Sequence, residues 1–340
     1  MGHDDPDFPA LRARKPTNRW IVVVFLVGMV ASLIHETHPE WIDRFSESDP
    51  PIRERLESER AVAEGQSLTE PKTPEIDAQA TRVSYAELKP VLNTVKSYRK
   101  LRACRAAPRI PATAYRAVPK DSPQSGVLAE EGHEVAKAWG LAIIDVSVEQ
   151  LWMAVNDEEA YPGTLPVTVS KVFKGKPFEN GRHVFQKMTL PGPFSDRWWI
   201  IRKTAGVDIF DASGGQMWEA CAENATNASL VRGTPLRSEL EDAEPVNWTW
   251  AGWLLMPLSE NLTLVEYFTW TDPGGSLPAG PASRFASGAV KKTMIKIASL
   301  ARRYGADDLL RGTRPDGAPL VQEPDALDGG AAVITDAAPD

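Results

Sequence analysis

The segment from Leu262 to Tyr304 limits the possible folds of this chain most strongly. An apolar strand over 262–271 runs into the turn Asp272-Pro273-Gly274-Gly275-Ser276-Leu277-Pro278, and a long amphipathic helix follows. Pro278 and Pro281 suit the first turn of that helix, and Gly305 suits the left-handed position after its last residue. A strand that passes through a Gly-Gly turn into a C-terminal helix supplies a curved antiparallel sheet with a lid. The segment therefore predicts a cavity beneath this helix.

The predicted helix has one apolar and one basic face. The apolar face repeats at helical intervals and comprises Ala286, Val290, Thr293, Ile297, Ala301 and Tyr304, with Met294 and Ala298 beside them. The basic face comprises Arg284, Lys291, Lys292, Lys296, Arg302 and Arg303. It serves either solvation alone or contact with anionic lipid headgroups.

Composition limits the function classes. The chain has 340 residues, is 42% hydrophobic and contains 28 prolines, which favours one folded domain with extended tails. Its net charge of −8 argues against a dominant role in binding nucleic acid, because contacts with phosphates need a surplus of Lys and Arg.

An uncharged run near the N-terminus, Trp20 to Ile34, is preceded by Arg12, Arg14, Lys15 and Arg19. As a helix it would reach about 23 Å, short of the hydrocarbon core of a bilayer. Three interpretations stay open: an uncleaved signal anchor, a signal peptide cleaved near Val30-Ala31-Ser32, and a buried helix of a soluble protein. The first predicts a single-pass membrane protein with an extracytoplasmic C-terminal domain. The second predicts an exported soluble protein.

The flanking regions differ from the middle of the chain in composition. Residues 1–19 form a basic, cytoplasmic N-terminus, and 20–35 form the transmembrane or signal segment. Residues 36–83 are rich in Pro, Glu and Ser, which predicts a disordered linker. Residues 84–133 form an N-terminal extension that contains a helix near 85–103, which begins at the capping-box spacing of Ser84 and Glu87. Residues 307–340 are predicted to be a disordered tail.

Residues 134–306 have the pattern of the folded domain. Ser147 and Gln150 predict the start of a short helix over 148–156. Short apolar segments with turn-length spacing predict an antiparallel sheet of about six or seven strands. The candidate segments from which these strands are expected cover 139–146, 167–173, 183–190, 197–203, 216–222, 229–232, 248–256 and 262–271.

This order of elements resembles the START-like (SRPBCC) helix-grip superfamily of lipid-binding domains. The segment Ser195-Asp196-Arg197-Trp198-Trp199-Ile200-Ile201-Arg202 is similar to the START strand that opens with Arg-Asp and an aromatic residue. The turn from Asp272 to Pro278 is similar to the family's approach to its last helix. The pattern departs at Trp198, where the family often has Asp. The resemblance covers about 134–305 and implies an α+β fold in which a curved sheet grips the C-terminal helix around a hydrophobic tunnel.

Candidate ligand-binding residues follow from the tunnel that the resemblance implies and from the aromatic content of the late strands. They are Arg197, Trp199, Trp218, Trp250, Glu266, Phe268, Trp270, Val290, Met294 and Ile297. Alternation places Glu266 on the same face as Leu264, Phe268 and Trp270, where a carboxylate needs a partner if it is buried. Arg197 or Arg202 on a neighbouring strand is the expected partner, unless this face is exposed to solvent.

The functional hypothesis is a membrane-tethered, non-enzymatic carrier or sensor of a lipid or other hydrophobic small molecule. The chain has no recognisable catalytic, metal-binding or phosphate-binding motif, and no cofactor, metal or nucleic-acid partner is expected. One alternative is an enzyme of the aromatase/cyclase type that uses Glu266, Asp145 or an arginine for acid–base chemistry. The other is an interaction module whose cavity is filled by its own side chains. Cys104 and Cys221 either pair in an oxidising compartment or remain separate thiols.

Overall fold

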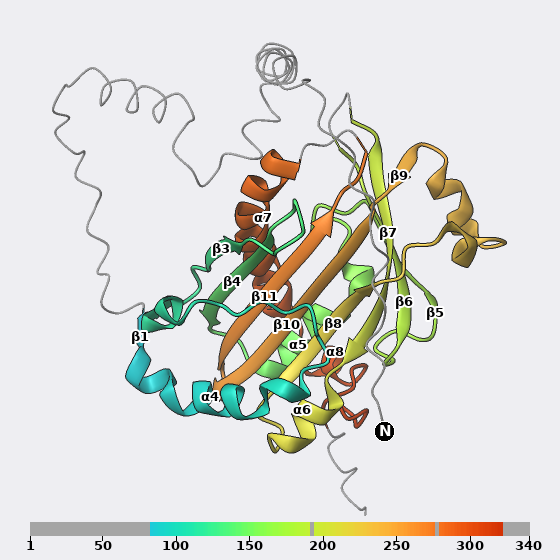
Figure 1. Cartoon of the computed structure of the whole chain (residues 1–340). Coiled ribbons are helices and arrows are strands. Elements are labelled where there is room, and N and C mark those ends of the chain that lie inside the picture. The colour runs from blue at the N-terminus through green and yellow to red at the C-terminus, as the bar shows by residue number, and fades with distance from the viewer. Residues whose placement is uncertain (1–81, 191–193, 276–278, 322–340) are drawn as a thin grey trace, which may run out of the picture. The chain divides into compact units, whose positions relative to one another are not determined.

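A computed structural model describes residues 82–190, 194–275 and 279–321, with the backbone alone for 279–285 (Figure 1). The chain divides into the units Met1–Ile76 and Asp77–Asp340, and the described residues belong to the second. The predicted transmembrane or signal segment and the linker after it lie outside the described residues.

Eleven strands and several helices are formed by these residues. The strands are β1 (Arg82–Ser84), β2 (Ala117–Pro119), β3 (Gln124–Leu128), β4 (Lys137–Ile144), β5 (Val169–Lys174), β6 (Arg182–Met188), β7 (Asp196–Ala205), β8 (Trp218–Asn224), β9 (Ala243–Pro245), β10 (Trp248–Ser259) and β11 (Leu262–Asp272). The α-helices are α4 (Tyr85–Tyr98), α5 (Val148–Asn156), α6 (Val207–Ala212), α7 (Ala279–Ala301) and α8 (Ala306–Leu309). The 3-10 helices are η1 (Arg99–Leu101), η2 (Ala112–Arg116), η3 (Glu158–Ala160), η4 (Ala228–Val231) and η5 (Pro235–Leu240).

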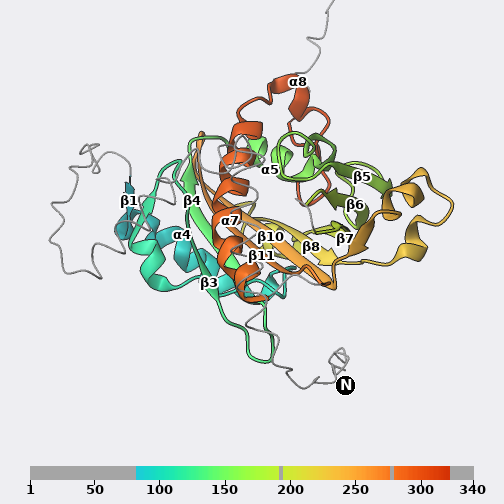
Figure 2. The same ribbon diagram turned by 90° about the horizontal axis from the view of Figure 1, so that it is seen from above.

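The main sheet has nine strands, in the order β3-β4-β11-β10-β8-β7-β6-β5 with β9 beside β7. All pairs are antiparallel except β7 with β9. The sheet curves around α7 and α5, as the view from above shows (Figure 2). The fold is therefore α+β with one large sheet, as predicted, although the sheet has more strands than the six or seven expected.

Local sequence explains the starts of two helices. The Ser84 side chain accepts from the Glu87 amide and the Glu87 carboxylate accepts from the Ser84 amide, which forms the predicted capping box. The Ser147 hydroxyl accepts from the Gln150 amide at the start of α5, whose bounds agree with the predicted helix.

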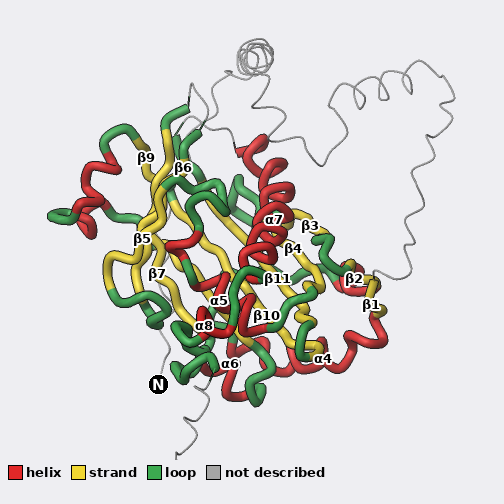
Figure 3. The backbone as a smooth tube through the Cα atoms, turned by 180° about the vertical axis from the view of Figure 1, so that it is seen from behind, coloured by secondary structure: helices red, strands yellow, loops and turns green. Residues whose placement is uncertain are grey.

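The face of the sheet that packs against α7 and α5 is called the inner face here (Figure 3). Val290, Met294 and Ile297 of α7 are fully buried against it. Gly140 of β4 permits their close approach, since a Cβ atom at this position would lie 2.5 Å from Val290 Cγ1. The predicted closing helix thus forms and buries its predicted apolar face.

On the opposite face of the sheet, called the outer face here, residues 82–119 cover β4, β11, β10 and β8, while η4 and η5 cover β6 and β7. Leu88 of α4, Cys104 and Val118 pack there with Leu141 and Phe268 of the sheet. In Figure 1 this extension crosses in front of β11, β10 and β8. Apolar packing on both faces makes the sheet the middle layer of three.

Two predicted segments differ from the structure. Residues 229–232 were expected to form a strand, but η4 occupies most of this segment, because Asn227 caps the turn through the Ser229 amide. The tail was expected to be disordered from 307 onward, yet residues 307–321 are described and pack on α5. Leu320 is buried there, and the Trp152 indole donates to the Thr313 carbonyl at 2.7 Å.

The predicted membrane localisation is corrected. Within residues 82–190, 194–275 and 279–321, no helix combines the length and the apolar character needed to cross a membrane.

Candidate ligand-binding face

Strand register assigns the predicted site residues to two different faces of the sheet. Tyr267 lies opposite Gly140, which contacts α7, and therefore belongs to the inner face. Its neighbour Phe268 lies opposite Trp139 and belongs to the outer face. By this alternation the inner face and α7 hold Arg197, Trp199, Trp218, Val290, Met294 and Ile297. The outer face holds Trp250, Glu266, Phe268 and Trp270.

Glu266 is the clearest correction to the predicted site. Its carboxylate accepts from the Tyr115 hydroxyl at 2.6 Å and from Arg102 at 3.3 Å, not from Arg197 or Arg202. The adjacent cavity has a volume of about 10 Å³, enough for one water at most. Burial, together with the negative charge of Glu266, raises the pKa of Tyr115 well above its usual value. Glu266 therefore anchors the extension and does not line a tunnel under α7.

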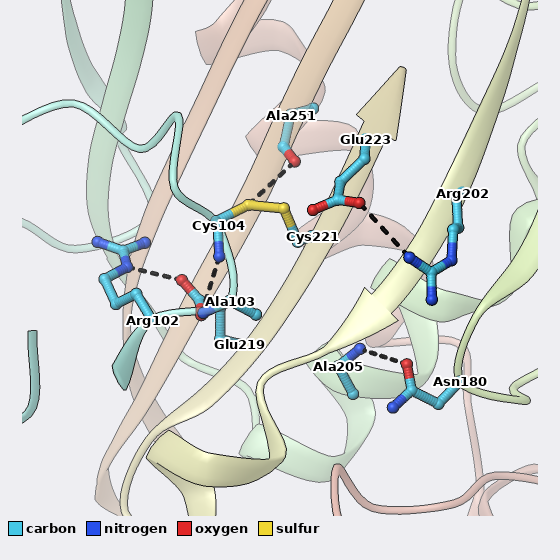
Figure 4. Close-up of a disulfide and its surroundings, with 10 residues drawn as sticks. All are labelled: Arg102, Ala103, Cys104, Asn180, Arg202, Ala205, Glu219, Cys221, Glu223 and Ala251. Atoms are coloured by element: carbon cyan, nitrogen blue, oxygen red, sulfur yellow. Dashed lines mark hydrogen bonds and ion pairs between the residues drawn. A yellow bond between two sulfur atoms is a disulfide. The ribbon is translucent and has the colours of Figure 1, made fainter. Parts of the chain in front are cut away.

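Glu219 of β8 anchors the same extension. Its carboxylate accepts from Arg102 Nε at 2.6 Å and from the Ala103 amide at 2.5 Å, and the side chain is fully buried (Figure 4). Next to it, Cys104 and Cys221 form a disulfide. Figure 4 shows the ion pair and the disulfide side by side on the outer face. The sequence left the pairing of the two cysteines open, and the structure pairs them.

The predicted site residues Trp250, Phe268 and Trp270 have structural neighbours on the outer face. Trp270 packs edge-on against Trp248 at 4.6 Å and donates through its indole to the Val135 carbonyl at 2.9 Å. Phe268 and Trp250 belong to the apolar layer under the extension. These residues were expected in the tunnel because alternation separates two faces without showing which one α7 covers.

Arg197 lies on the inner-face side of β7 but binds the turn that precedes α7. Its guanidinium donates to the carbonyls of Pro273 at 2.9 Å and Ser195 at 2.6 Å, and it lies 3.3 Å from a carboxylate oxygen of Glu244. Gly275, with φ of +64°, has no room for a Cβ atom beside Arg197 and Glu244. The Arg197 side chain therefore fixes the turn that leads into α7.

The half of the inner face nearest α5 is filled by protein side chains. Trp218 contacts the rings of Trp152 and Phe210 with centroids 5.6 Å and 5.3 Å away. Trp253 stacks on Tyr267 at 4.1 Å, and burial raises the pKa of Tyr267 to about 12. Trp218 is thus a core residue, although the sequence hypothesis placed it at the ligand.

The middle of the inner face combines small residues with a neutralised charge cluster. Ala251 lies beside Ala222, and Ala222 lies beside Lys203 in the register of β10, β8 and β7. Lys203 Nζ lies 3.3 Å from Glu158 and donates to the Val155 carbonyl at 2.9 Å. Arg182 donates to the same carboxylate at 2.5 Å. Burial, followed by the nearby Arg182 charge, lowers the pKa of Lys203 to about 8.

Beyond these alanines the inner face carries uncharged polar side chains beside the apolar Val184 and Ile201. Trp199 Nε1 donates to Gln186 Oε1 at 2.7 Å, and Gln186 Nε2 donates to Ser170 Oγ at 3.2 Å; these three residues are called the amide row here. The hydroxyls of Thr249 and Thr271 lie 2.7 Å apart, and those of Thr269 and Thr271 lie 3.3 Å apart. These three threonines are called the hydroxyl cluster.

Of the six residues in the amide row and the hydroxyl cluster, only Trp199 was predicted from the sequence. The five that were missed are Ser170, Gln186, Thr249, Thr269 and Thr271. The sequence did contain one signal for the hydroxyl cluster. Thr249 lies near the start of one long predicted strand, and Thr269 and Thr271 lie near the end of the next. In a hairpin these positions are about equally far from the connecting turn, so they become neighbours. Partial solvent exposure of Ala251, Thr269, Thr271 and Trp199 shows that α7 does not seal this part of the inner face.

A second, shallow recess of about 530 Å³ lies outside the sheet, where the C-terminal ends of α5 and α7 meet α8. Its polar groups bind one another: Tyr304 donates to Asp157 at 3.0 Å, and Arg303 donates to Thr164 at 3.2 Å. This recess has no part in the site considered below.

Comparisons with known proteins place these observations beside solved structures. No protein-family model matches the chain, and no curated protein sequence matches it. The structure is similar to human STARD10, with 17% identity, 62% of this chain and 78% of that chain covered, and a TM-score of 0.45. It is similar to the STAR-related lipid transfer protein from Xanthomonas axonopodis, with 18% identity, 54% and 94% covered, and a TM-score of 0.45.

An enzyme also appears among the similar structures. The Zhui aromatase/cyclase from Streptomyces has 11% identity, 50% of this chain and 95% of that chain covered, and a TM-score of 0.32. The predicted resemblance is confirmed at the level of fold by the strand order, by the curved sheet and by the position of α7. The chain has a START-like helix-grip fold.

Proposed function

We propose that this domain binds a lipid or other hydrophobic small molecule between α7 and the inner face formed by β5, β6, β7, β8 and the start of β10. The proposal assigns the domain the role of a non-enzymatic carrier or sensor. The observation that carries it is the change along the inner face: large packed rings near α5 give way to small, partly exposed residues around Ala251.

The apolar character of this region supports a hydrophobic ligand. Val184, Ile201 and Ala222 form a separate apolar group there, packed against Val172 and Trp199. Apolar walls with a few placed polar groups are the usual composition of small-molecule sites. The hydroxyl cluster and the amide row supply these polar groups.

The alternative function, an enzyme of the aromatase/cyclase type, is not supported by the residues of the inner face. Glu266, its main candidate for acid–base chemistry, lies on the outer face with Tyr115 and Arg102. Asp145 follows β4 as an exposed residue.

Native mass spectrometry of the protein purified from its host tests the proposal. A co-purifying apolar molecule is expected, and Ala251→Phe, which fills the proposed space, is expected to remove it. Ala289→Phe on the exposed side of α7 is the matched control and should retain it. A wild-type protein that carries no apolar molecule and binds none added in vitro would contradict the proposal and favour an interaction module with a filled interior.

A further inference from the structure

We propose that the ligand's polar end is an uncharged hydroxyl or carbonyl group bound at the hydroxyl cluster, and that carboxylate, phosphate and ammonium ends are rejected. This inference rests on the proposed function, because it specifies the class of ligand for the same inner face. It is based on the hydrogen-bonding capacity of Thr249, Thr269 and Thr271 and on how the nearby charges are paired.

The hydroxyl cluster can both donate and accept. Thr249 and Thr271 lie directly opposite each other on β10 and β11, and Thr269 lies two residues before Thr271 on the same face. The Tyr267 hydroxyl also bonds with Thr269, so four hydroxyls carry four hydrogens, and the three bonds between them, of which two measure 2.7 Å and 3.3 Å, use three. Within the described residues, one hydrogen and several lone pairs are left for another group. A ligand hydroxyl matches both, and a ligand carbonyl matches the hydrogen.

The position of the cluster suits an amphiphile. Thr249 is mostly buried, whereas Thr269 and Thr271 keep partial exposure. Ala251 lies opposite Thr269, so the hydroxyls border the small apolar part of the inner face. A ligand with its polar end at Thr271 would therefore place its apolar part against Ala251, Ala222 and Ile201.

Charged side chains of the inner-face strands are paired with protein groups. Lys203 and Arg182 share the Glu158 carboxylate, and Arg197 is bound to backbone carbonyls and Glu244. Together with Glu244 of β9, which is in register with Arg197, these are the charged residues that alternation assigns to the inner face in the described parts of the sheet. The amide row adds only neutral groups, since its indole, amide and hydroxyl bind one another.

The pairing determines which ligand ends are tolerated. A carboxylate or ammonium group moved from water to this face would meet hydroxyls but, among the described residues of the sheet strands, no opposite charge that lacks a partner. Burial of a charge without a partner is far more costly than burial of a hydroxyl that finds a hydrogen bond. The arrangement therefore favours a neutral end over either charged one.

Three probes that share one unsaturated chain test the inference: oleyl alcohol, oleate and oleylamine, measured by displacement of a fluorescent apolar probe from the full chain. Oleyl alcohol is expected to bind at least about 100-fold more tightly than the two charged probes. Thr271→Val removes one hydroxyl with little change in shape and should weaken oleyl alcohol by about 3- to 10-fold, without affecting a plain hydrocarbon of the same length. Thr249→Val is a second variant with the same expected effect.

Thr204→Val is the control, because Thr204 pairs with Cys221 on the outer face and should leave all affinities unchanged. Equal or tighter binding of oleate or oleylamine, or unchanged affinity for oleyl alcohol in both folded variants, would overturn the assignment of a neutral end while the proposed function stands. Failure of all probes, including the hydrocarbon, would overturn the proposed function and this inference together.

Discussion

Arg102 and Glu219 form an ion pair at 2.6 Å although they are 117 residues apart in sequence. Both side chains are withdrawn from solvent, and Arg102 also reaches Glu266 at 3.3 Å. One arginine of the extension thus neutralises carboxylates on two strands of the outer face. The folded state depends on a residue outside the domain limits that the sequence suggests.

Arg102→Met should lower the free energy of unfolding by about 3–5 kcal/mol, because it leaves Glu219 and Glu266 buried without their cation. Arg105→Met is the control, since Arg105 is exposed and donates only to the Lys100 carbonyl at 3.1 Å. Denaturant titration of both variants checks the prediction. Similar unfolding curves for the two variants would contradict it.

Loss of the Cys104–Cys221 disulfide should destabilise the domain, since the bond closes a loop between residues 117 positions apart. The loop-entropy relation gives about 4–5 kcal/mol as an upper estimate. The double variant Cys104→Ser/Cys221→Ser should unfold at lower temperature than the oxidised wild type. Reductant should lower the wild-type melting temperature towards that of the variant and leave the variant unchanged, which calorimetry can measure.

Gly140→Ala should destabilise the packing of α7 by about 1–3 kcal/mol, as expected for overpacking of a core. The new Cβ atom would lie 2.5 Å from Val290 Cγ1, and Val290 is a short, fully buried side chain. Gly288→Ala in α7 has nothing within 4 Å of the added Cβ atom and should be neutral or stabilising. Hydrogen exchange of the α7 amides should increase in the first variant only.

Stability should rise with pH from about 8 towards 10.5 through Lys203, whose pKa is lowered from 10.5 to about 8 in the folded state. In this window the unfolded chain holds the Lys203 proton and the folded chain has released it, so proton removal favours folding. Lys203→Met should remove this rise. Lys171→Met, at an exposed lysine, should preserve it in urea titrations at several pH values.

Adjacent tryptophans of β7 should differ in effect because they point to opposite faces. Trp199→Ala should reduce the retention of the bound apolar molecule, while Trp198→Ala should mainly reduce stability, by about 3–5 kcal/mol. Trp198 is buried with Phe185 and Ile200 on the outer face, and Trp199 binds Gln186 on the inner face. Native mass spectra and melting curves of the same two variants separate these effects. An equal loss of ligand in both would contradict the assignment of faces.

Local sequence patterns predict the elements of this fold well. Ser147 and Gln150 mark the start of α5, and the Gly-Gly turn separates β11 from α7 as expected. These signals depend only on residues that are close in the sequence, so they can be recognised in a single sequence. Gly305 was expected in the left-handed position after Tyr304, but α7 ends at Ala301 and Gly305, with φ of −92°, precedes α8. Short elements such as β1, β2 and β9 have no comparable signal, because pairing with distant segments defines them.

The site was harder to predict, because alternation groups Glu266 with Phe268 and Trp270 without showing which layer covers them. Apolar side chains line both faces of β11, so hydrophobicity does not separate the lid side from the extension side. The partners of Glu266 are Tyr115 and Arg102, which lie 151 and 164 positions away and outside the strands considered. The hydroxyl cluster requires the register of β10 and β11, which fixes Thr249 opposite Thr271.

The extension over 82–119 also determines how this protein can be dissected. A shortened chain that begins at Glu134, where the sequence places the start of the domain, would lose Leu88, Cys104 and Val118 and expose the apolar outer face. Cys221 would become a single thiol, and Glu219 would lose its arginine. Such a fragment should self-associate during expression, whereas one that begins before Arg82 should yield a monodisperse protein. The choice of the first residue of a shortened chain therefore decides whether the outer face stays covered and whether ligand binding can be measured on a folded domain.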